Sequence, residues 1–243
     1  MSSRSLVGIV VAGALTLGGC HSSAVPASAP TPSAVNSLSA AEQRAGWRLL
    51  FDGRTTTGWR GYRSDTMPTA WHVVDGVLTK STGTDDIVTR TTFQDFELRF
   101  DWKIGTGGNS GVFYRASEEY DHVYWTGPEY QLLDDANAGD GKNRLTSAGA
   151  AYGLYPSPAG IVKPANEWNT SRIVVRGHHV EHWMNGQKLL AYELESPDWA
   201  AKVAASKFAV WPDYGKLAKG FIAIQGDHNG TLALRNIMIR ELK

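Results

Sequence analysis

The feature that most constrains this chain is a strict alternation of apolar and charged residues between positions 96 and 104. The apolar members are Phe96, Leu98, Phe100, Trp102 and Ile104, and the charged members are Glu97, Arg99, Asp101 and Lys103. Side chains of a β-strand point alternately to the two faces of a sheet. The segment therefore predicts a half-buried antiparallel strand with one solvated face.

Two dipeptides predict tight hairpins. Asp75-Gly76 separates residues 71–74 from 77–80, and Asn185-Gly186 separates residues 180–184 from 187–192. Both dipeptides suit a two-residue turn between antiparallel strands. The other strand candidates are residues 47–51, 111–115, 129–133, 171–176, 221–225 and 231–240.

Helix signals are few. Ser39-Ala40-Ala41-Glu42 is a capping-box pattern that Gly46 can end, and a surface helix is expected over about residues 198–208. Many short strands with one or two short helices predict an all-β fold, a two-sheet antiparallel β-sandwich. We expect the terminal strand to pair near Trp47–Phe51.

The N-terminus predicts an export signal. Leu6–Leu17 is an uncharged apolar run after Arg4, and it suits a signal peptide better than a membrane span. Small residues before Cys20, the single cysteine of the chain, resemble a bacterial lipoprotein signal, in which that cysteine is acylated. An ordinary secretory signal cut near Gly19 is the alternative.

Three regions follow from this interpretation. Residues 1–19 are a signal peptide, residues 20–38 are the lipidated Cys20 with a Ser/Ala/Pro-rich tether, and residues 39–243 are the folded β-sandwich domain. We expect an extracytoplasmic lipoprotein anchored to a membrane. The outer membrane is favoured, with the domain facing the periplasm or the cell surface.

Composition narrows the class of partner. Lys plus Arg and Asp plus Glu both number 24, so the formal charge is zero and no basic face for nucleic acid is expected. The nine Trp and 26 Gly suit sheets with a sugar-sized binding surface. No protein partner is predicted.

Polar residues recur at matching strand positions. Alternation places Asn109 with Arg115 on one face of a strand and Glu129 with Gln131 on one face of the next. Further polar positions are Gln225, His228 in the turn Gly226–Gly230, and Arg235 in the last strand. We expect Arg115, Glu129, Gln131, Gln225 and Arg235 to line one concave sheet. A solvated outer face is the alternative.

The run from Glu129 to Asp134 has the polar spacing of the Glu-x-Asp-x-x-Glu strand of laminarinase-type β-glucanases. Those enzymes use two carboxylates, one as nucleophile and one as acid. Here the middle residue is Gln131 and the last is the shorter Asp134, which argues against the ordinary retaining mechanism.

Several segments together, over about residues 40–243, resemble the 3-keto-disaccharide hydrolase family. They are Leu50-Phe51-Asp52-Gly53, Gly58-Trp59, Asn109-Ser110-Gly111-Val112 with Arg115, Glu129 to Asp134, Gly149-Ala150-Ala151-Tyr152, Glu167-Trp168-Asn169, Asn185-Gly186, Gln225-Gly226-Asp227-His228 and Leu234-Arg235-Asn236-Ile237. The resemblance implies a concanavalin A-like jelly roll that cleaves glycosides oxidised at the third carbon of the sugar.

A ketone at that position acidifies the neighbouring hydrogen, so elimination of the glycosidic oxygen and hydration can follow. We assign Glu129 as base or acid, with His228 as its partner. The remaining candidates are Arg115 and Arg235 for oxyanion charge, Asn109, Gln131 and Gln225 for hydroxyl groups, Asp134 for orienting an Arg or His, and Trp125 for stacking on a sugar ring. The alternatives are a lyase that stops after elimination, a noncatalytic carbohydrate-binding module and an ordinary glycosidase.

Metal signals are weak. His178, His179 and His182 lack a helical metal-binding spacing, so no metal site is predicted there. The oxygen-rich loop from Asp134 to Gly141 departs from the EF-hand pattern. No cofactor is predicted, and a calcium ion in another type of site stays an alternative.

Overall fold

The computed structural model describes Met1 and residues 34–243. The predicted signal peptide, Cys20 and most of the tether lie outside the described residues. Contacts with the domain begin at Asn36, three residues before the predicted boundary. Its side chain donates to the carbonyl of Gly76 over 2.6 Å and accepts from the amide of Asn236 over 2.8 Å.

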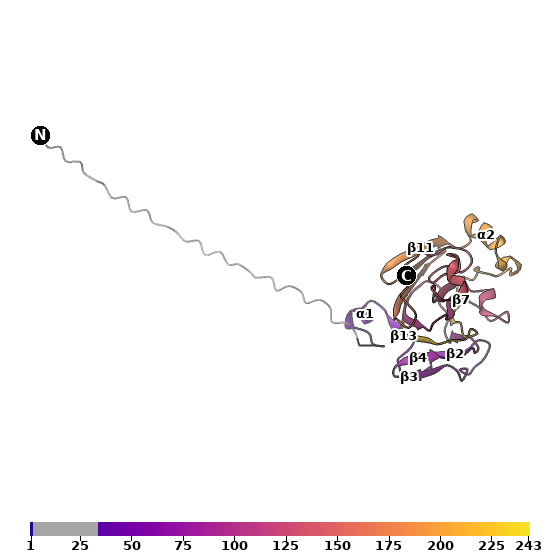
Figure 1. Cartoon of the computed structure of the whole chain (residues 1–243), viewed down its shortest axis with the longest axis horizontal. Coiled ribbons are helices and arrows are strands. Elements are labelled where there is room, and N and C mark those ends of the chain that lie inside the picture. Colours follow the sequence, from indigo (N-terminus) through magenta and orange to yellow (C-terminus); the bar gives the residue numbers. More distant parts are fainter. Residues whose placement is uncertain (2–33) are drawn as a thin grey trace. The chain divides into compact units, whose positions relative to one another are not determined.

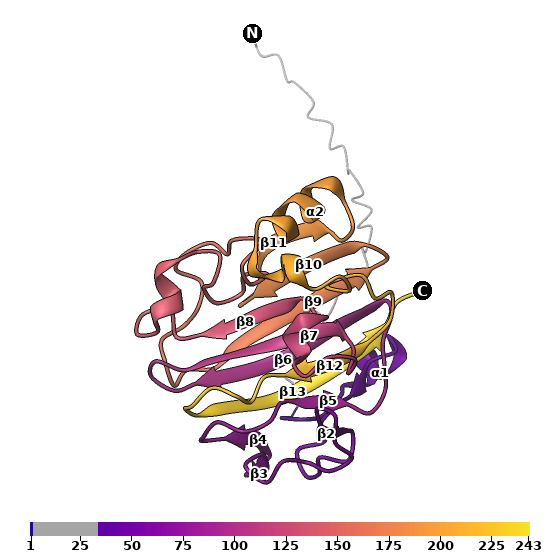
Figure 2. The same ribbon diagram turned by 90° about the vertical axis from the view of Figure 1, so that its right-hand side faces the viewer.

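Residues 34–243 form two antiparallel sheets packed face to face (Figures 1 and 2). The eight-stranded sheet has the order β11-β10-β9-β6-β13-β4-β3, with β1 beside β13. Its strands are β1 (Arg48–Leu49), β3 (His72–Val74), β4 (Val77–Lys80), β6 (Phe96–Ile104), β9 (Asn169–Arg176), β10 (His179–Met184), β11 (Gln187–Glu193) and β13 (Leu232–Glu241).

The five-stranded sheet has the order β2-β5-β12-β7-β8. Its strands are β2 (Trp59–Gly61), β5 (Ile87–Thr89), β12 (Phe221–Ile224), β7 (Asn109–Ala116) and β8 (Glu129–Leu133). The helices are α1 (Ala40–Arg44), α2 (Pro197–Ala204) and the 3-10 turns η1 (Val123–Trp125), η2 (Gly139–Lys142) and η3 (Lys207–Val210). The predicted all-β, two-sheet jelly-roll architecture is confirmed.

The main core lies between the sheets. Phe100 and Trp102 of β6 meet Tyr130 of β8 there, with ring centroids of Phe100 and Tyr130 5.9 Å apart. Trp102 also donates its indole N–H to Ser171 over 2.8 Å, so its polar atom is satisfied in the interior. Burial of each large side chain contributes roughly 2–3 kcal/mol. The alternation over residues 96–104 therefore correctly predicted which face is buried.

Both predicted hairpins are confirmed. Asp75 and Gly76 have φ of 50° and 79°, and Asn185 and Gly186 have φ of 48° and 82°. Two successive left-handed residues are what a type I′ turn requires. The predicted pairing of the last strand is also confirmed, since β1 pairs with β13.

Helix predictions hold in part. Ser39 caps α1 with both hydrogen bonds of a capping box. The helix expected over residues 198–208 divides instead, because α2 ends at Ala204 and Ser206 then caps the separate turn η3. Within the described residues, no helix has the length and apolar character needed to cross a bilayer.

Candidate active site

A cavity of about 210 Å³ lies on the outer face of the five-stranded sheet. The face is set by alternation, because Val112 and Tyr114 of β7 point into the core while Asn109 and Phe113 point away from it. The cavity is lined by Asn109 from β7, Glu129 from β8, Gln225 beyond β12, Asp227 and His228 from the following turn, Tyr124 from η1, Asp140 from η2, Tyr152, and Lys207 from η3.

Glu129 sits at the floor of this cavity with 6% of its surface exposed. The glycine at position 111 on the neighbouring strand makes room for this side chain, because a Cβ atom there would collide with the Oε1 atom of Glu129. No residue in the described part of the chain donates a hydrogen bond to its carboxyl group. The carboxyl group is therefore buried and available to a ligand.

Burial raises the pKa of Glu129 to about 8. The positive charge of Lys207 opposes this rise, and the carboxylates of Asp86, Asp227 and Asp140 add to it. At neutral pH the carboxyl group is mostly protonated. It can donate a proton at pH 7, which an ordinary surface glutamate cannot do.

Lys207 supplies positive charge opposite Glu129. Its ammonium nitrogen lies 4.4 Å from the ring centroid of Tyr152 and 5.8 Å from that of Tyr124. These two tyrosines also line the cavity, so cation–π contacts hold the ammonium group at the mouth. The sequence pattern does not mark Lys207, because this residue lies in a short 3-10 turn without a periodic arrangement of apolar residues.

The turn after β12 contributes an imidazole and a carboxylate. Nε2 of His228 lies 3.7 Å from Oδ1 of Asp227, and both side chains are nearly half exposed. The structure thus brings His228 and Glu129 to the same cavity, as the sequence predicted for the pair. Asp227 was not among the predicted site residues, although it directly precedes His228.

Amide side chains complete the lining. Gln225 is 6% exposed, and its Oε1 atom has no hydrogen-bond partner among the described residues. Asn109 donates weakly to Asp140 over 3.5 Å, and Tyr152 donates to the same oxygen over 3.4 Å. An unpartnered buried acceptor costs roughly 1–3 kcal/mol, which a ligand hydroxyl group can recover.

Arg115 lies away from the cavity, contrary to the predicted alternation. It has φ of 50°, and the pairing of β7 with β12 shifts register at this point. Such a β-bulge reverses the side-chain pattern. The guanidinium group donates to the carbonyl of Gln94 over 3.1 Å and pairs with Asp95 over 3.1 Å.

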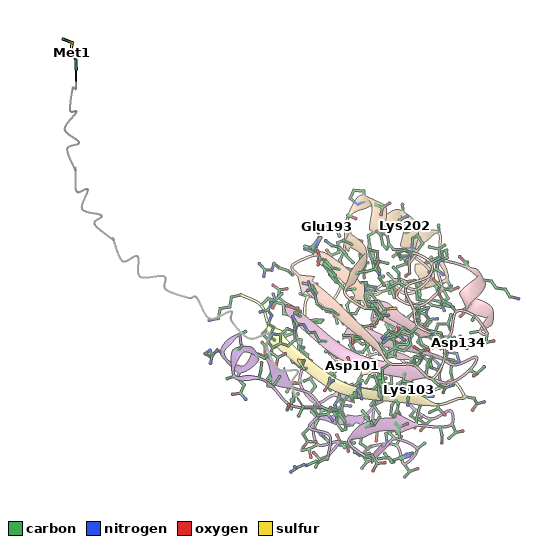
Figure 3. The ribbon with its side chains drawn as sticks, turned by 60° about the vertical axis from the view of Figure 1, so that its left-hand side comes forward. Met1, Asp101, Lys103, Asp134, Glu193 and Lys202 are labelled. Atoms are coloured by element: carbon green, nitrogen blue, oxygen red, sulfur yellow. The ribbon has the colours of Figure 1, made fainter. Side chains whose placement is uncertain are left out.

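Arg235 belongs to the other sheet, so its predicted place beside Glu129 is wrong. It lies on β13, where its Nε atom is 3.4 Å from Asp101. Its guanidinium group covers the ring of Trp168 at 4.0 Å. Figure 3 shows Asp101 beside Lys103 on β6, whose charged side chains face away from the core.

Gln131 and Asp134 support the neighbouring loops and do not line the cavity. Gln131 is fully buried and donates to the carbonyl of Thr146 over 3.1 Å, and its Oε1 atom has no partner among the described residues. Asp134, just past β8 (Figure 3), accepts from the amide of Gly107 over 2.8 Å and from Asn137 over 2.7 Å.

The environment of Asp134 fixes its charge. Burial would raise the pKa of this carboxyl group, but the hydrogen bonds from Gly107, Asn137 and Ala136 outweigh burial and lower it. Asp134 therefore stays ionised as an acceptor for loop amides. Glu129 and Asp134, the two carboxyl groups at the β-glucanase spacing, therefore do not share this cavity.

Trp125 lies behind the cavity wall. Its ring stacks on Trp211 with centroids 3.9 Å apart and meets the edge of Tyr124 at 6.0 Å. Tyr124 takes the lining position. Tyr214 is buried against Phe208 with centroids 4.1 Å apart, so it does not offer its ring to a sugar.

Of the three histidines on or beside β10, His182 is structural, while His178 and His179 lie at the surface beside Glu195 and Glu193. His182 is fully buried, with Nε2 3.0 Å from the hydroxyl group of Tyr114 and Nδ1 3.0 Å from the carbonyl of Gly149. In residues 34–243, no three side chains of His, Cys, Asp or Glu gather in a way that could hold a metal.

Fold and site together define a jelly-roll domain with a polar cavity built around a protonated carboxyl group. The chain belongs to the family of 3-keto-alpha-glucoside-1,2-lyase-like domains, whose model matches residues 46–240. A relative from Bacteroides thetaiotaomicron, named 3-keto-disaccharide hydrolase, is 34% identical over 230 residues. The match covers 81% of this chain and 79% of the relative.

Solved structures agree with the fold. A crystal structure of a glycosyl hydrolase candidate from Parabacteroides distasonis superposes with a TM-score of 0.81 at 35% identity. It covers 86% of this chain and 100% of that protein. A Bacillus subtilis protein with a galectin-like fold has a TM-score of 0.50 at 11% identity, with coverage of 86% and 94%, and shows the shared fold alone.

Proposed function

We propose that this protein is a glycoside hydrolase for 3-keto-glycosides and 3-keto-disaccharides. The observation that carries the proposal is Glu129, a buried carboxyl group without a hydrogen-bond partner among residues 34–243, in a polar cavity with His228 and Lys207. The family and the name of the Bacteroides thetaiotaomicron relative supply the substrate class.

The cavity suits one sugar ring. Its volume of about 210 Å³ is below the roughly 300–1,000 Å³ of pockets for drug-sized ligands. The oxidised ring occupies the cavity, and the second sugar lies at the mouth beside Tyr124 and Lys207. Gln225 and Asn109 hold the hydroxyl groups of the bound ring.

The reaction proceeds by elimination and hydration. A base removes the hydrogen on the second carbon, and its electron pair forms the enolate of the ketone at the third carbon. The enolate collapses to a double bond between the first and second carbons while the bond to the glycosidic oxygen breaks. That oxygen leaves with a proton from an acid, and water then adds across the double bond.

The site offers one group for each role. Protonated Glu129 serves as the acid for the leaving oxygen, because burial keeps its proton in place at neutral pH. His228, beside Asp227, accepts the proton from carbon. Lys207 stabilises the enolate oxygen by its charge.

A lyase is the second candidate. Only the hydration step distinguishes the two outcomes, and the same residues would perform the elimination. A lyase releases the unsaturated keto sugar, and a hydrolase releases the hydrated one. A noncatalytic binding module would use the amide side chains without turnover.

The test is to incubate the protein with trehalose, lactose and their 3-keto forms and to measure the sugars released. We expect turnover of the keto forms alone. Glu129→Gln should lower the rate by at least about a hundredfold, whereas Glu119→Gln, at an exposed position, should leave it unchanged. Binding without turnover, cleavage of unoxidised glucan or a fully active Glu129→Gln variant would each contradict the proposal.

We also propose that the domain acts outside the cytoplasm, tethered by acylated Cys20. The proposal rests on the apolar leader, on the position of the single cysteine and on the Ser/Ala/Pro-rich segment that follows it. A tether of this composition allows the cavity to reach sugars near the membrane surface.

A further inference from the structure

The turn that carries Asp227 and His228 rests on a segment that crosses between the two sheets. Residues 81–86 connect β4 of the eight-stranded sheet to β5 of the five-stranded sheet. Thr84 donates its amide to the carbonyl of Gly226 over 2.9 Å. Gly83 donates its amide to the side chain of Asn229 over 3.0 Å. Both ends of the turn are therefore bound to this crossover.

The contact is close enough to require glycine on both sides. A Cβ atom on Gly226 would collide with the carbonyl oxygen of Asp85. A Cβ atom on Gly83 would lie 2.8 Å from the carbonyl oxygen of Asp227. The two backbones thus pack directly on each other, and a shift of the crossover must shift the turn.

Two buried charges flank this contact. Lys80, the last residue of β4, is 1% exposed, and its ammonium group donates to the carbonyl of His228 over 2.5 Å. Asp86 is 8% exposed, and its carboxyl group accepts from the amide of Gly226 over 2.7 Å. Neither side chain lines the cavity.

Stability alone does not explain a buried lysine at this position. Burial lowers the pKa of Lys80, which shows that its environment disfavours the charge. An apolar side chain of similar length would avoid that penalty, but it would leave the carbonyl of His228 without this donor. What the ammonium group adds over an apolar side chain is its hydrogen bond to the backbone carbonyl of His228.

We propose that Lys80 and Asp86 are positioning residues of the site: they hold the Gly226–Asn229 turn so that His228 and Asp227 face Glu129. The inference rests on the proposed function for its kinetic readout. Misplacement of a reacting group by about 1 Å can cost about a hundredfold in rate. Lys80 acts on catalysis through His228, whereas Asp86 acts through His228 and also adds to the raised pKa of Glu129.

The kinetic test is a double-mutant cycle on a 3-keto-disaccharide, with Tm measured for every variant. Lys80→Met and Asp86→Asn should each lower kcat by about ten- to a hundredfold. In a His228→Ala background Lys80→Met should alter kcat by less than about twofold. Lys103→Met, on the outer face of β6, is the control and should leave kcat unchanged.

Stability separates this role from a structural one. Lys80→Met should lower kcat by more than its loss of folded protein explains, because the ammonium group that holds the carbonyl of His228 is removed. If activity falls only in proportion to lost folded protein, or falls equally with and without His228, the positioning role is overturned.

A second readout needs no substrate. The imidazole resonances of His228 in the full-length protein should shift in Lys80→Met and in Asp86→Asn, and should match wild type in Lys103→Met. Unchanged resonances in both variants would overturn the inference. Shifted resonances in a protein that fails to turn over any keto sugar would contradict the proposed function and leave the positioning role standing.

Discussion

Glu129 keeps a proton at neutral pH because the cavity gives its carboxyl group neither a hydrogen-bond donor nor free access to water. Its folded pKa of about 8 lies above the ordinary value of 4.5. Between these values the folded protein binds more protons than the unfolded chain, so this group makes stability fall as pH rises. The fall begins near the ordinary pKa and ends above the folded one.

Glu129→Gln should therefore stabilise the protein at alkaline pH. The gain relative to wild type should be near zero at pH 4 and reach at most about 5 kcal/mol at pH 9. Denaturant unfolding of both proteins across this range measures it. A constant difference between the two proteins would show that Glu129 titrates normally.

Glu129 should also determine the pH at which kcat falls on the alkaline side. If the protonated form is the acid, kcat falls as pH rises through about 8. Because Lys207 lowers the pKa of Glu129, Lys207→Met should move this fall to higher pH while reducing kcat. If the fall of kcat at alkaline pH occurs at the same pH in this variant as in the wild type, Lys207 does not influence the pKa of Glu129.

Gly111 of β7 has no side chain, and the carboxyl group of Glu129 occupies the space that a Cβ atom would fill. Gly111→Ala should displace the carboxyl group of Glu129 and lower kcat by about a hundredfold with only a modest loss of stability. Gly105→Ala serves as the control, because its Cβ atom would meet Thr231 at ordinary contact distances. Equal activity of the two variants would show that the floor of the cavity tolerates a methyl group.

Among the strands, β6, β9 and β13 are tied together by one buried carboxylate. Glu97, 3% exposed, lies 3.1 Å from Arg99, 3.3 Å from Arg172 and 2.8 Å from Arg240. Arg99 also stacks on Trp47 at 4.2 Å. The carboxylate compensates three guanidinium groups on the outer face of the large sheet.

Glu97→Gln should cost about 2 kcal/mol of stability, because it removes the carboxylate that these three partly exposed cations share. Glu241→Gln, which removes an exposed pair with Arg48, should cost less than about 0.5 kcal/mol. Urea unfolding of both variants and of the wild type measures the two losses of stability. Similar losses in both variants would contradict the central role of Glu97.

The regular elements were the predictable part of the molecule. Alternation gave the bounds of β6 and β8, and it placed Asn109, Glu129 and Gln225 on one face. It failed at Arg115, because a single left-handed residue in β7 reverses the pattern and no local signal marks it. The short strands β2 and β5 carried too few residues to show a period.

The site as a whole was less predictable than the sheets. Its sequence-predicted members come from strands or from the turn after β12, whereas Asp140 and Lys207 come from the separate 3-10 turns η2 and η3. Their approach to Glu129 depends on how those loops fold over the sheet, which the chain pattern does not encode locally. The prediction for Arg235 is wrong for a related reason. Alternation shows which residues of one strand share a face, but it does not show to which sheet that strand belongs.

At the scale of the whole protein, the lipid anchor is a separable part. Cys20→Ser should release the protein from the membrane fraction into the soluble extracytoplasmic fraction, with the activity of the domain unchanged. Fractionation with an assay on a 3-keto-disaccharide measures both. A Cys20→Ser protein that stays with the membrane would contradict acylation at this position.

The stacked indoles of Trp125 and Trp211 give the molecule a built-in optical reporter. They adjoin Tyr124 in the cavity wall. A sugar that enters changes the polarity around these rings, so intrinsic fluorescence can follow occupancy in real time. Titration of the Glu129→Gln variant would then yield affinities for intact substrates without a label.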